Sequence, residues 1–354
     1  MGKMESKLGW YKGKRVLITG HTGFKGTWLL SILEWAGADV TGISDSSNYR
    51  LYEQAKGSIR HNSLVCDIRD EEKVERAIKG INPDVIFHLA AQPLVIEGYR
   101  DFRRTWSTNV MGTLNVLEGI GCSANVVIAT TDKVYKNTNN GFPFRESDGL
   151  GSADPYSASK AATELVVQSW RKRNMAMGVL KDVYVATARA GNVIGGGDYA
   201  KDRIIPDLVR DSLEKKTTRI RSPKAVRPWQ HVLDALNGYL LLGIELETVS
   251  EKMSEGVSFN FGPTENDWIC VDEIVERAKG YMEIRTVNES IDIPEAKLLM
   301  LDSGLARTEL DWRCKWNVDQ ALKETFDWYK DVEIGGISPH DAMRGCIRRF
   351  WEYE

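Results

Sequence analysis

An α/β fold with a doubly wound parallel sheet is predicted from two features of the sequence. Short apolar runs alternate with helical patterns of about ten or more residues as far as residue 189, and this alternation is typical of parallel strands joined by helical crossovers. The first run, Arg15 to Thr19, is rich in β-branched residues and stops at Gly20. A strand of that kind is usually buried on both faces of its sheet, so we expect helices on both sides.

The later elements follow from the spacing of the apolar residues. Between Thr27 and Ala36, Trp28 and Ile32 recur at the spacing of one helix face, and Gly37 follows as a C-cap. The same reasoning predicts, in chain order, Val40 to Ile43 (strand), Glu71 to Ile78 (helix), Val85 to Leu89 (strand), Val110 to Ile120 (helix), Asn125 to Ala129 (strand), Tyr156 to Trp170 (helix) and Val183 to Ala188 (strand).

The pattern changes after Ala190. A glycine-rich stretch from Gly191 to Asp198 and prolines at positions 206, 223, 228 and 263 interrupt short elements, and Val232 to Leu246 has the pattern of one more long helix. We therefore predict a nucleotide-binding domain over residues 1–189. Residues 190–354 are expected to form mainly a smaller C-terminal substrate-binding lobe, interleaved with returns to the main sheet.

The composition excludes several classes of protein. The 354 residues contain 47 Lys+Arg and 50 Asp+Glu, a net charge of −3, which lacks the basic character of a nucleic-acid-binding protein. The 11 Trp, 12 Tyr and 9 Phe supply ample area for a core, and no apolar run approaches the roughly 20 residues of a membrane span. Five scattered cysteines without a CxxC pair argue against disulfides and a metal site, and for the cytoplasm.

A glycine-rich loop follows the first predicted strand and opens the first helix: Gly20-His21-Thr22-Gly23-Phe24-Lys25-Gly26. Glycines there allow a tight turn and let backbone N–H groups approach a pyrophosphate at the positive end of the helix. An ordinary strand-to-helix turn can have the same glycines. Because this is the first βα unit of an α/β chain, we interpret it as a Rossmann-type dinucleotide site.

Two acidic residues are candidates for the adenosine end of that site. Asp45 lies just past the second strand, where a carboxylate accepts from ribose hydroxyls and repels a 2′-phosphate, so it predicts NAD and makes NADP less favoured. Lys25 and Arg50 are nearby cations that can oppose this preference. Asp67 ends an expected third strand and either accepts from an adenine amino group or caps the turn before the next helix.

A Tyr–Lys pair is the first candidate for chemistry. Tyr156 and Lys160 stand four residues apart on a predicted helix, so both side chains emerge on one face. The ammonium is expected to pull the pKa of the phenol from about 10 toward neutrality, so that a phenolate can remove a hydroxyl proton while hydride leaves the same carbon. YxxxK is common by chance, and its place after the fifth strand is what favours a catalytic role.

A polar run follows the fifth strand at its carboxyl end, the edge where open α/β sheets bind ligands. Thr130, Thr131, Asp132 and Lys133 offer hydroxyl donors and an acid/base pair in succession, although a polar loop is the alternative. His88, at the end of the fourth strand, is expected to be packed in the core instead.

Two further features are ambiguous from the sequence. Arg227 precedes the long predicted helix of the second half, where a guanidinium suits bidentate capture of a diphosphate, although in isolation such an arginine is more often structural. Three consecutive glycines at 195–197 either contribute to the site or only shape a loop.

Together these segments resemble the extended short-chain dehydrogenase/reductases, and within them the branch of 4,6-dehydratases that act on CDP-glucose. The resemblance covers nearly the whole chain. It rests on GHTGFKGTWL (from Gly20), FHLAAQPLV (from Phe87), TNVMGTLNVLE (from Thr108), TTDKVY (from Thr130), DPYSASKAATELV (from Asp154), RAGNVIGGGDYAKDRIIPDLVR (from Arg189), RPWQHVLDALNGY (from Arg227), NFGP (from Asn260) and LDSGLARTELDW (from Leu301).

The glycine loop and YxxxK are shared by the whole superfamily, whereas other features are specific to one branch. Related dTDP- and GDP-sugar dehydratases usually have Asp-Glu or Ser-Glu where this chain has Asp132 and Lys133, so Lys133 supports the CDP-sugar branch. Two segments depart from the family pattern: Asp45 to Gln54, which lacks the usual proline-rich loop, and the insertion from Lys136 to Leu150.

The resemblance implies a hydro-lyase that converts CDP-glucose to CDP-4-keto-6-deoxyglucose with tightly bound, recycled NAD. Tyr156 would take the proton of the sugar 4-hydroxyl, and Thr131 would polarise the resulting ketone. Asp132 would be the acid at C6 and Lys133 the proton-transfer partner at C5, although these two roles are interchangeable. For them, a closed pocket must raise the pKa of Asp132 or lower that of Lys133.

The resemblance also implies a set of binding residues and a homodimer or homotetramer in deoxysugar biosynthesis. The expected cofactor-binding residues are Gly20, Thr22, Gly23, Phe24, Lys25, Gly26, Asp45, Asp67, Ile68, Leu89, Ala90, Ala91, Thr108, Thr130, Tyr156 and Lys160. The expected substrate-binding residues are Gln92, Asn192, Arg203, Arg227 and His231, and no metal is expected.

Three alternatives remain open at this point. The substrate could be GDP-mannose or dTDP-glucose, or the chain could be a sugar-nucleotide 4-epimerase, which needs no acid/base pair at C5 and C6. From a different class, it could be an inactive NAD-binding regulator. Such a protein would be expected to have lost Tyr156, Lys160 or Asp132, and all three are present.

Overall fold

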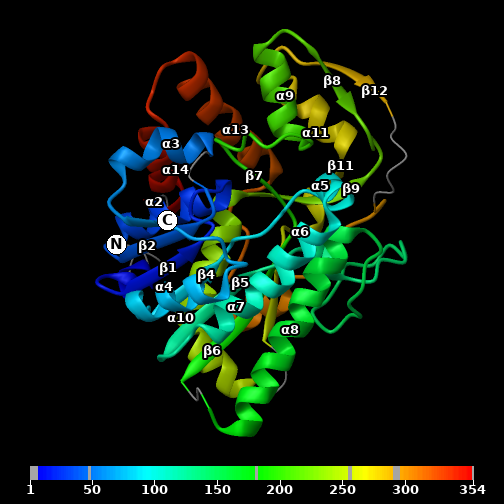
Figure 1. Cartoon of the computed structure of the whole chain (residues 1–354). Coiled ribbons are helices and arrows are strands. Elements are labelled where there is room, and N and C mark those ends of the chain that lie inside the picture. Colours follow the sequence, from blue (N-terminus) through cyan, green and yellow to red (C-terminus); the bar gives the residue numbers. More distant parts are fainter. Residues whose placement is uncertain (1–6, 47–48, 180–181, 254–256, 290–295, 353–354) are drawn as a thin grey trace.

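A sheet of seven parallel strands forms the centre of the protein (Figure 1). The computed structural model describes residues 7–46, 49–179, 182–253, 257–289 and 296–352. Across the sheet the order is β3-β2-β1-β4-β5-β6-β10, with bounds β1 (Arg15–Thr19), β2 (Asp39–Ser44), β3 (Asn62–Val65), β4 (Val85–His88), β5 (Ala124–Ala129), β6 (Val183–Ala190) and β10 (Ser258–Phe261). The predicted doubly wound parallel sheet is confirmed.

The strand order reverses between β1 and β4, which lie side by side with Thr19 opposite His88. The chain leaves β1 toward one side of the sheet and β4 toward the other, so a crevice opens at their carboxyl ends. This geometry brings the glycine loop after β1 next to Leu89 and Ala90 after β4, and it decides where a ligand can bind.

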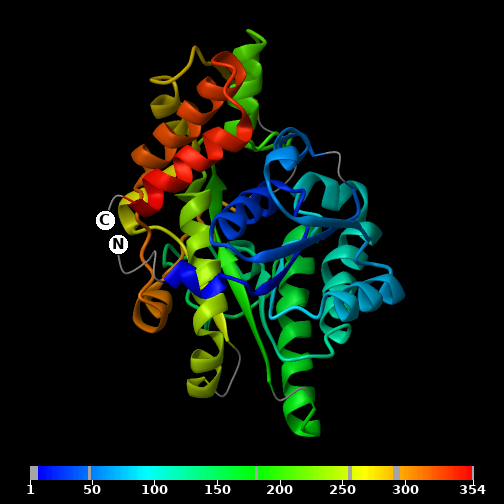
Figure 2. The ribbon, with the colours of Figure 1, turned by 90° about the vertical axis from the view of Figure 1, so that its left-hand side faces the viewer.

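Helices cover both faces of the sheet, because its strands alternate apolar side chains between two cores. Val16 and Ile18 belong to one core, and Leu17 between them belongs to the other. On the first face lie α2 (Phe24–Trp35) and α10 (Val232–Lys252). On the second lie α4 (Glu71–Ile81), α7 (Gly112–Glu118) and α8 (Pro155–Met177). Figure 2, turned by 90°, shows these layers.

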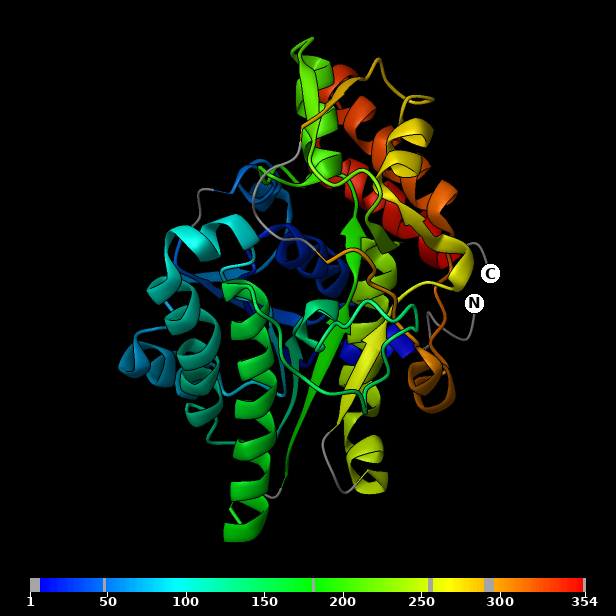
Figure 3. The same ribbon diagram turned by 90° about the vertical axis from the view of Figure 1, so that its right-hand side faces the viewer.

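Smaller elements build the rest of the chain. Two small sheets lie in the upper lobe (Figures 1 and 3). Their strands are β7 (Asn192–Ile194), β9 (Val226–His231) and β11 (Trp268–Cys270) in one, and β8 (Thr217–Ile220) and β12 (Arg285–Asn288) in the other. The remaining helices are α3 (Arg50–Ala55), α5 (Val95–Arg100), α6 (Phe102–Trp106), α9 (Ile204–Leu213), α11 (Val271–Ala278), α12 (Gly304–Leu310), α13 (Val318–Tyr329) and α14 (Pro339–Glu352), with short 3-10 or π turns at Gly9–Tyr11, Lys56–Ser58, Ser107–Met111, Asp132–Val134, Glu265–Asp267 and Lys330–Ile334.

Elements of the second half of the chain other than α10 also return to the first half. Strand β10 pairs with β6 at the edge of the main sheet, and α14 packs against α2 and α3. One apolar core therefore contains residues of both halves, such as Trp28 and Trp351. The division into a domain of residues 1–189 and a lobe of residues 190–354 stays a prediction.

Most of the predicted elements exist, but several bounds differ. The first helix starts at Phe24, not Thr27, since the glycine loop runs directly into it, and Gly37 follows it with a left-handed φ of +79°. The helix predicted to end at Trp170 continues to Met177 and stops at Gly178. The helix expected from Val110 begins as the π turn and becomes regular at Gly112.

Candidate active site

A cavity of about 1540 Å³ lies at the carboxyl edge of the main sheet, between the sheet and the upper lobe. This volume exceeds the roughly 300–1,000 Å³ of a site for one small molecule, so there is room for a cofactor together with a substrate. Every predicted site residue except His231 lines it. The structure thus brings together residues that are up to about 200 positions apart in the sequence, as the carboxyl-edge rule requires.

The packing of the chain itself explains two glycines of the glycine loop but not the third. Gly20 has a φ of +72°, and a Cβ on it would lie 2.8 Å from the backbone of Ala90. A Cβ on Gly26 would lie 2.2 Å from the Gly20 oxygen, so both positions require glycine. At Gly23, by contrast, a Cβ would have only an ordinary contact of 3.4 Å, so the chain's own packing does not demand glycine there.

Gly23 is the N-cap residue of α2 and provides no side-chain cap for the first helical turn. The N–H groups of that turn lack intrahelical acceptors and lie at the cavity wall formed by Gly23, Phe24 and Lys25. Bare N–H groups at a positive helix end, with room above a glycine, fit the diphosphate of a dinucleotide.

Two carboxylates line the other end of this cavity wall, where they can accept hydrogen bonds from an adenosine. Asp45 lines the cavity, and its carboxylate lies 3.8 Å from the guanidinium of Arg104. Asp67 accepts from the backbone and side chain of Arg69, with a backbone contact of 2.9 Å, and this lowers its pKa. Asp67 therefore caps its own turn while lining the cavity, and Asp70 caps the next helix.

Neither Arg50 nor Lys25, the two cations expected near Asp45, contacts that carboxylate in the structure. Arg50 makes two hydrogen bonds of 2.7 and 2.8 Å to Glu333 and stacks on Tyr199, whereas Lys25 contacts Tyr239. The two arginines that do act on this end, at positions 69 and 104, were missed from the sequence because both are distant from the glycine loop along the chain.

The segment after β5 forms the catalytic wall. Thr131 caps the 3-10 turn Asp132–Val134 by accepting from the Lys133 backbone N–H (3.4 Å), and its hydroxyl donates to Asp132 Oδ1 at 3.0 Å. Asp132 is only 2% exposed, and its Oδ2 has no hydrogen-bond partner among the described residues. Burial raises the pKa of Asp132, and the charge of Lys133 opposes this effect.

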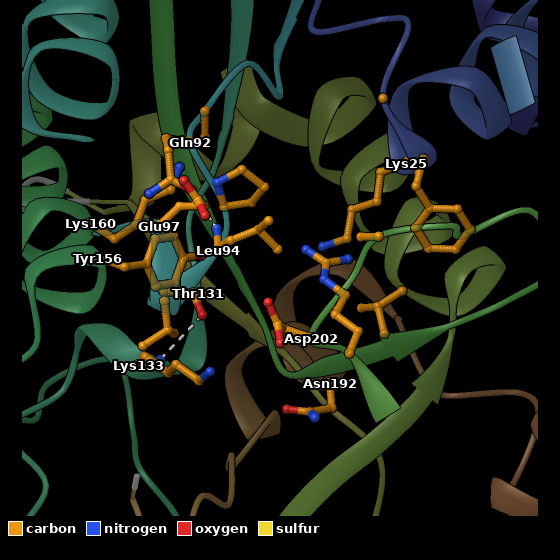
Figure 4. Close-up of a pocket in the computed structure, with 18 of the residues that line it drawn as sticks. Lys25, Gln92, Leu94, Glu97, Thr131, Lys133, Tyr156, Lys160, Asn192 and Asp202 are labelled. Atoms are coloured by element: carbon orange, nitrogen blue, oxygen red, sulfur yellow. Dashed lines mark hydrogen bonds between the residues drawn. The ribbon is translucent and has the colours of Figure 1, made fainter. Parts of the chain in front are cut away.

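Tyr156 and Lys160 lie on the same wall as predicted, but their electrostatics differ from the prediction. Figure 4 shows Tyr156, Lys160, Thr131 and Lys133 on one side of the cavity. Burial raises the pKa of Tyr156 to about 12, while a hydrogen bond with Thr131 and the charge of Arg203 lower it. Lys160 donates instead to the Ala129 carbonyl at 3.0 Å, and burial lowers its own pKa to about 8.

The expected lowering of the phenol pKa by Lys160 is therefore wrong for this structure. The i, i+4 spacing places both side chains on one helix face, but it does not decide whether the ammonium contacts the phenol or a backbone oxygen. Desolvation of the phenol outweighs the nearby positive charges here.

A buried ion pair lies behind the catalytic wall and was not foreseen. Glu164, one turn after Lys160, accepts from Arg189 at 2.8 and 3.0 Å, and the two side chains are 0% and 1% exposed. Glu164 also accepts from Thr130 at 2.6 Å, and Arg189 donates to Tyr135 Oη at 2.9 Å. The pair thus fixes both flanks of the turn that holds Asp132. Its sequence signal is the i+4 spacing of Glu164 from Lys160.

The predicted substrate residues have unequal support. Arg203 lies at the cavity and pairs with Asp198 at 2.9 Å, and Arg227 lines the cavity from β9. Asn192 lies on the wall below Lys25 in Figure 4. The amide of Gln92 bonds to Thr105 and the Leu94 N–H, so it shapes the wall.

The prediction that His231 binds the substrate must be corrected. Its side chain is fully buried outside the cavity wall, its Nδ1 accepts from the Leu233 N–H at 3.2 Å as the N-cap of α10, and its ring lies 4.8 Å from that of Trp316. Burial lowers its pKa to about 3. The sequence prediction failed because a histidine before a helix looks the same as a cap and as a ligand.

Other expectations have simple outcomes. His88 is buried between Thr19 and Thr113, as predicted for a core residue. A Cβ on Gly196 would lie 2.1 Å from the ring of Trp328, so this glycine of the triplet shapes a loop. Within the described ranges there is no cluster of three metal-ligating side chains, and no helix is long and apolar enough to cross a membrane.

Comparison with known proteins agrees with this geometry. A sequence model of the family "GDP-mannose 4,6 dehydratase" matches residues 17–325. CDP-glucose 4,6-dehydratase of Salmonella typhimurium is 40% identical over 330 residues, 90% of this chain and 91% of the relative.

Solved structures share the fold. An epimerase of Methanothermobacter thermautotrophicus superimposes with a TM-score of 0.79 at 23% identity, covering 94% of this chain and 96% of the other. UDP-glucuronic acid 4-epimerase of Bacillus cereus, solved with UDP-glucuronic acid and NAD, gives 0.75 at 20% identity, with 90% and 99% covered. From the family match and the 40% identity, the chain belongs to the nucleotide-sugar 4,6-dehydratases, hydro-lyases of the extended short-chain dehydrogenase/reductase family.

Proposed function

We propose that the protein converts CDP-glucose to CDP-4-keto-6-deoxyglucose with NAD as a recycled cofactor. The observation that carries this proposal is Asp132: a 2% exposed carboxyl group with a raised pKa and one unpartnered oxygen, beside Thr131 on the wall that also holds Tyr156. Epimerisation at C4 needs one proton acceptor, whereas loss of water needs a second group that can donate a proton.

Tyr156 takes the proton of the 4-hydroxyl, and the Thr131 hydroxyl donates to the oxygen at C4 as it becomes a ketone. A phenol with a pKa of about 12 holds its proton firmly at neutral pH. Thr131 and Arg203, the two groups that lower this pKa, are therefore part of what makes Tyr156 a usable base.

The C4 ketone acidifies the hydrogen at C5, and water then leaves across C5 and C6. Lys133 accepts the C5 proton, and Asp132 protonates the departing 6-hydroxyl. Burial raises the pKa of Asp132, which helps this carboxyl group to act as a proton donor. Bound at the glycine loop, NAD would supply the hydride acceptor for C4 and the hydride donor for C6, and Lys133 would return a proton to C5, so that no net reduced cofactor appears.

The choice of CDP-glucose is supported by Lys133 and by the relative that is 40% identical. The test is to incubate the protein separately with CDP-glucose, dTDP-glucose, UDP-glucose and GDP-mannose in deuterated water. We expect loss of water from CDP-glucose, solvent deuterium at C5 and, at C6, one hydrogen from the substrate's own C4. Stoichiometric NADH with unlabelled C5, or a change at C4 without loss of water, would contradict a dehydratase.

NAD is proposed over NADP because the Asp45 carboxylate lines the cavity at the adenosine end, where a 2′-phosphate would meet it. Arg104 is close enough to Asp45 to compete with this effect. We expect NAD to bind at least about tenfold more tightly than NADP, and Asp45→Asn to reduce that ratio. Titration of cofactor-free protein with each nucleotide measures it, and tighter binding of NADP would overturn the assignment.

Two further expectations belong to this proposal. The five cysteines are free thiols, which supports a reducing compartment such as the cytoplasm. The homodimer or homotetramer expected from the family stays a prediction, which sedimentation of the purified chain would test.

A further inference from the structure

The carboxylate of Glu164 lies behind the catalytic wall, and no step above uses it. Glu164 is on α8 one turn after Lys160, and its side chain is fully buried. Five hydrogen bonds reach its two oxygens: from Thr130 next to β5 (2.6 Å), from Thr187 (2.7 Å) and Arg189 (2.8 and 3.0 Å) on β6, and from Ser258 on β10 (3.4 Å). Three adjacent strands of the main sheet are thus tied to one side chain of α8.

Glu164 keeps its negative charge although it is buried. Burial alone would raise the pKa of this carboxyl group, but the guanidinium of Arg189 and the hydroxyls of Thr130 and Thr187 outweigh that effect, so the pKa is lowered. The charge in turn acts on Lys160. Burial lowers the pKa of this ammonium to about 8, and the carboxylate of Glu164 opposes that shift. Both side chains are therefore charged at neutral pH.

Lys160 and Glu164 hold two consecutive residues at the end of β5. Lys160 donates to the carbonyl of Ala129 at 3.0 Å, and Glu164 accepts from the hydroxyl of Thr130 at 2.6 Å. The next residue along the chain is Thr131, with which the catalytic wall begins. Because the two bonds come from adjacent turns of one helix, they fix where this segment lies along α8.

This alignment matters because the first chemical step needs groups from both elements. Thr131 belongs to the segment after β5, and Tyr156 belongs to α8. Burial raises the pKa of Tyr156 to about 12, and the hydrogen bond between Tyr156 and Thr131 opposes that shift. Since a hydrogen bond weakens steeply with distance and angle, a displacement of one element past the other would leave the phenol with a firmer hold on its proton.

We propose that Glu164 is a positioning residue for the first step, because through Thr130 it holds Thr131 in register with Tyr156. The proposal rests on the function proposed above, in which Tyr156 takes the proton of the 4-hydroxyl. Glu164 lies outside the cavity wall, whereas Thr130, Thr131 and Tyr156 line it. Its effect on the reaction must therefore pass through the side chains that it binds.

Two threonines distinguish this role from a purely structural one. Thr130 immediately precedes Thr131, whereas Thr187 lies within β6, between two alanines that have no part in the reaction. Their hydrogen bonds to Glu164 are similar in length, one to each oxygen, and both side chains are buried. If the network contributed only stability, loss of either hydroxyl would have the same effect. If Glu164 aligns the wall, only loss of the Thr130 hydroxyl should slow the reaction.

The test compares Thr130→Val with Thr187→Val in the full chain, and we expect similar unfolding temperatures for the two variants. In a single turnover of CDP-glucose with excess enzyme, Thr130→Val should slow the reduction of bound NAD about tenfold, the weight of one hydrogen bond. Thr187→Val should slow it by less than about threefold. Titrations with NAD⁺ and with CDP should give nearly wild-type dissociation constants for both variants, so that the loss lies in the rate and not in binding.

Glu164→Gln is a stronger form of the same test. A glutamine has one acceptor oxygen, and its NH₂ group would face donors, so we expect NAD reduction to slow about 10²-fold. The control is Glu324→Gln on α13, whose carboxylate is 2% exposed, pairs with Arg349 at 2.7 Å and lies outside the cavity wall. This change should lower the unfolding temperature and leave the rate unchanged. If Glu164→Gln does not fold, the two threonine variants still decide.

Three results would count against these claims. Equal rates for the two threonine variants, whether both are slow or both are normal, would overturn the role of Glu164. Weaker NAD⁺ binding by Thr130→Val would also overturn it, because the hydroxyl would then make the direct cofactor contact expected from the sequence. A wild-type chain that neither reduces NAD nor releases dehydrated sugar nucleotide from CDP-glucose would reject the proposed function itself.

Discussion

Tyr156→Phe is expected to lower turnover of CDP-glucose by about 10²–10⁴-fold, the usual contribution of a general base, and to leave NAD binding within about a factor of three. The phenol is 8% exposed at the cavity wall, and the substitution removes one oxygen from an otherwise unchanged ring. The proton of the 4-hydroxyl then has no acceptor, so the first step is lost before any elimination can begin.

The matched control is Tyr11→Phe. It also removes one buried hydroxyl, which donates to the Leu240 carbonyl at 2.7 Å, away from the cavity wall. It should cost about 1 kcal/mol of the free energy of unfolding and leave turnover unchanged. Steady-state rates and a cofactor titration on both variants decide the matter. Wild-type turnover by Tyr156→Phe would remove Tyr156 from the mechanism.

The fold was predictable from the sequence where local pattern and tertiary environment agree. Residues 15–19 are apolar on both faces because two cores meet them, and the strand was predicted with its observed bounds. Helices α9 and α11 to α14 were not predicted, and their packing comes from distant partners. Trp351 of α14, for example, belongs to the core that contains Trp28.

The site, like the fold, could be predicted only in part. Which residues meet at the cavity follows from the carboxyl-edge rule, so the residues of the glycine loop and the run after β5 could be placed from the sequence. Orientation and charge could not. Whether Lys160 contacts Tyr156 or Ala129, and whether His231 lies in the cavity or caps α10, depends on side-chain directions that spacing does not determine.

The reason for a glycine can also lie in a residue that is distant along the sequence. Gly42 in β2 looks like a neutral strand residue, yet a Cβ there would lie 2.1 Å from the ring of His21. The need for glycine arises from a residue 21 positions earlier, which no local pattern can reveal. Gly20, in contrast, sits at a turn where a positive φ is expected, and it was correctly assigned to the turn after β1.

Asp132→Asn combined with Lys133→Met is expected to stop the reaction after oxidation. The two hydrogen bonds that hold the Thr131 hydroxyl should survive both substitutions. An asparagine oxygen at position 132 can still accept from the Thr131 hydroxyl, and the backbone N–H of residue 133 still donates to it. The ketone should therefore still form. Its elimination should not, because the carboxyl proton for the 6-hydroxyl and the amine for the C5 proton are both gone.

The measurement is a single turnover with excess enzyme, following the absorbance of reduced nicotinamide and the release of dehydrated sugar nucleotide. We expect reduced nicotinamide to accumulate and product to fall by about 10²-fold or more, while C5 takes up little solvent deuterium. The single variants divide the loss: Lys133→Met should block C5 exchange, whereas Asp132→Asn should allow exchange without loss of water. Normal product formation would place the elimination groups elsewhere. Loss of the reduced nicotinamide signal as well would mean that Asp132 or Lys133 acts in the first step, against the roles proposed for them.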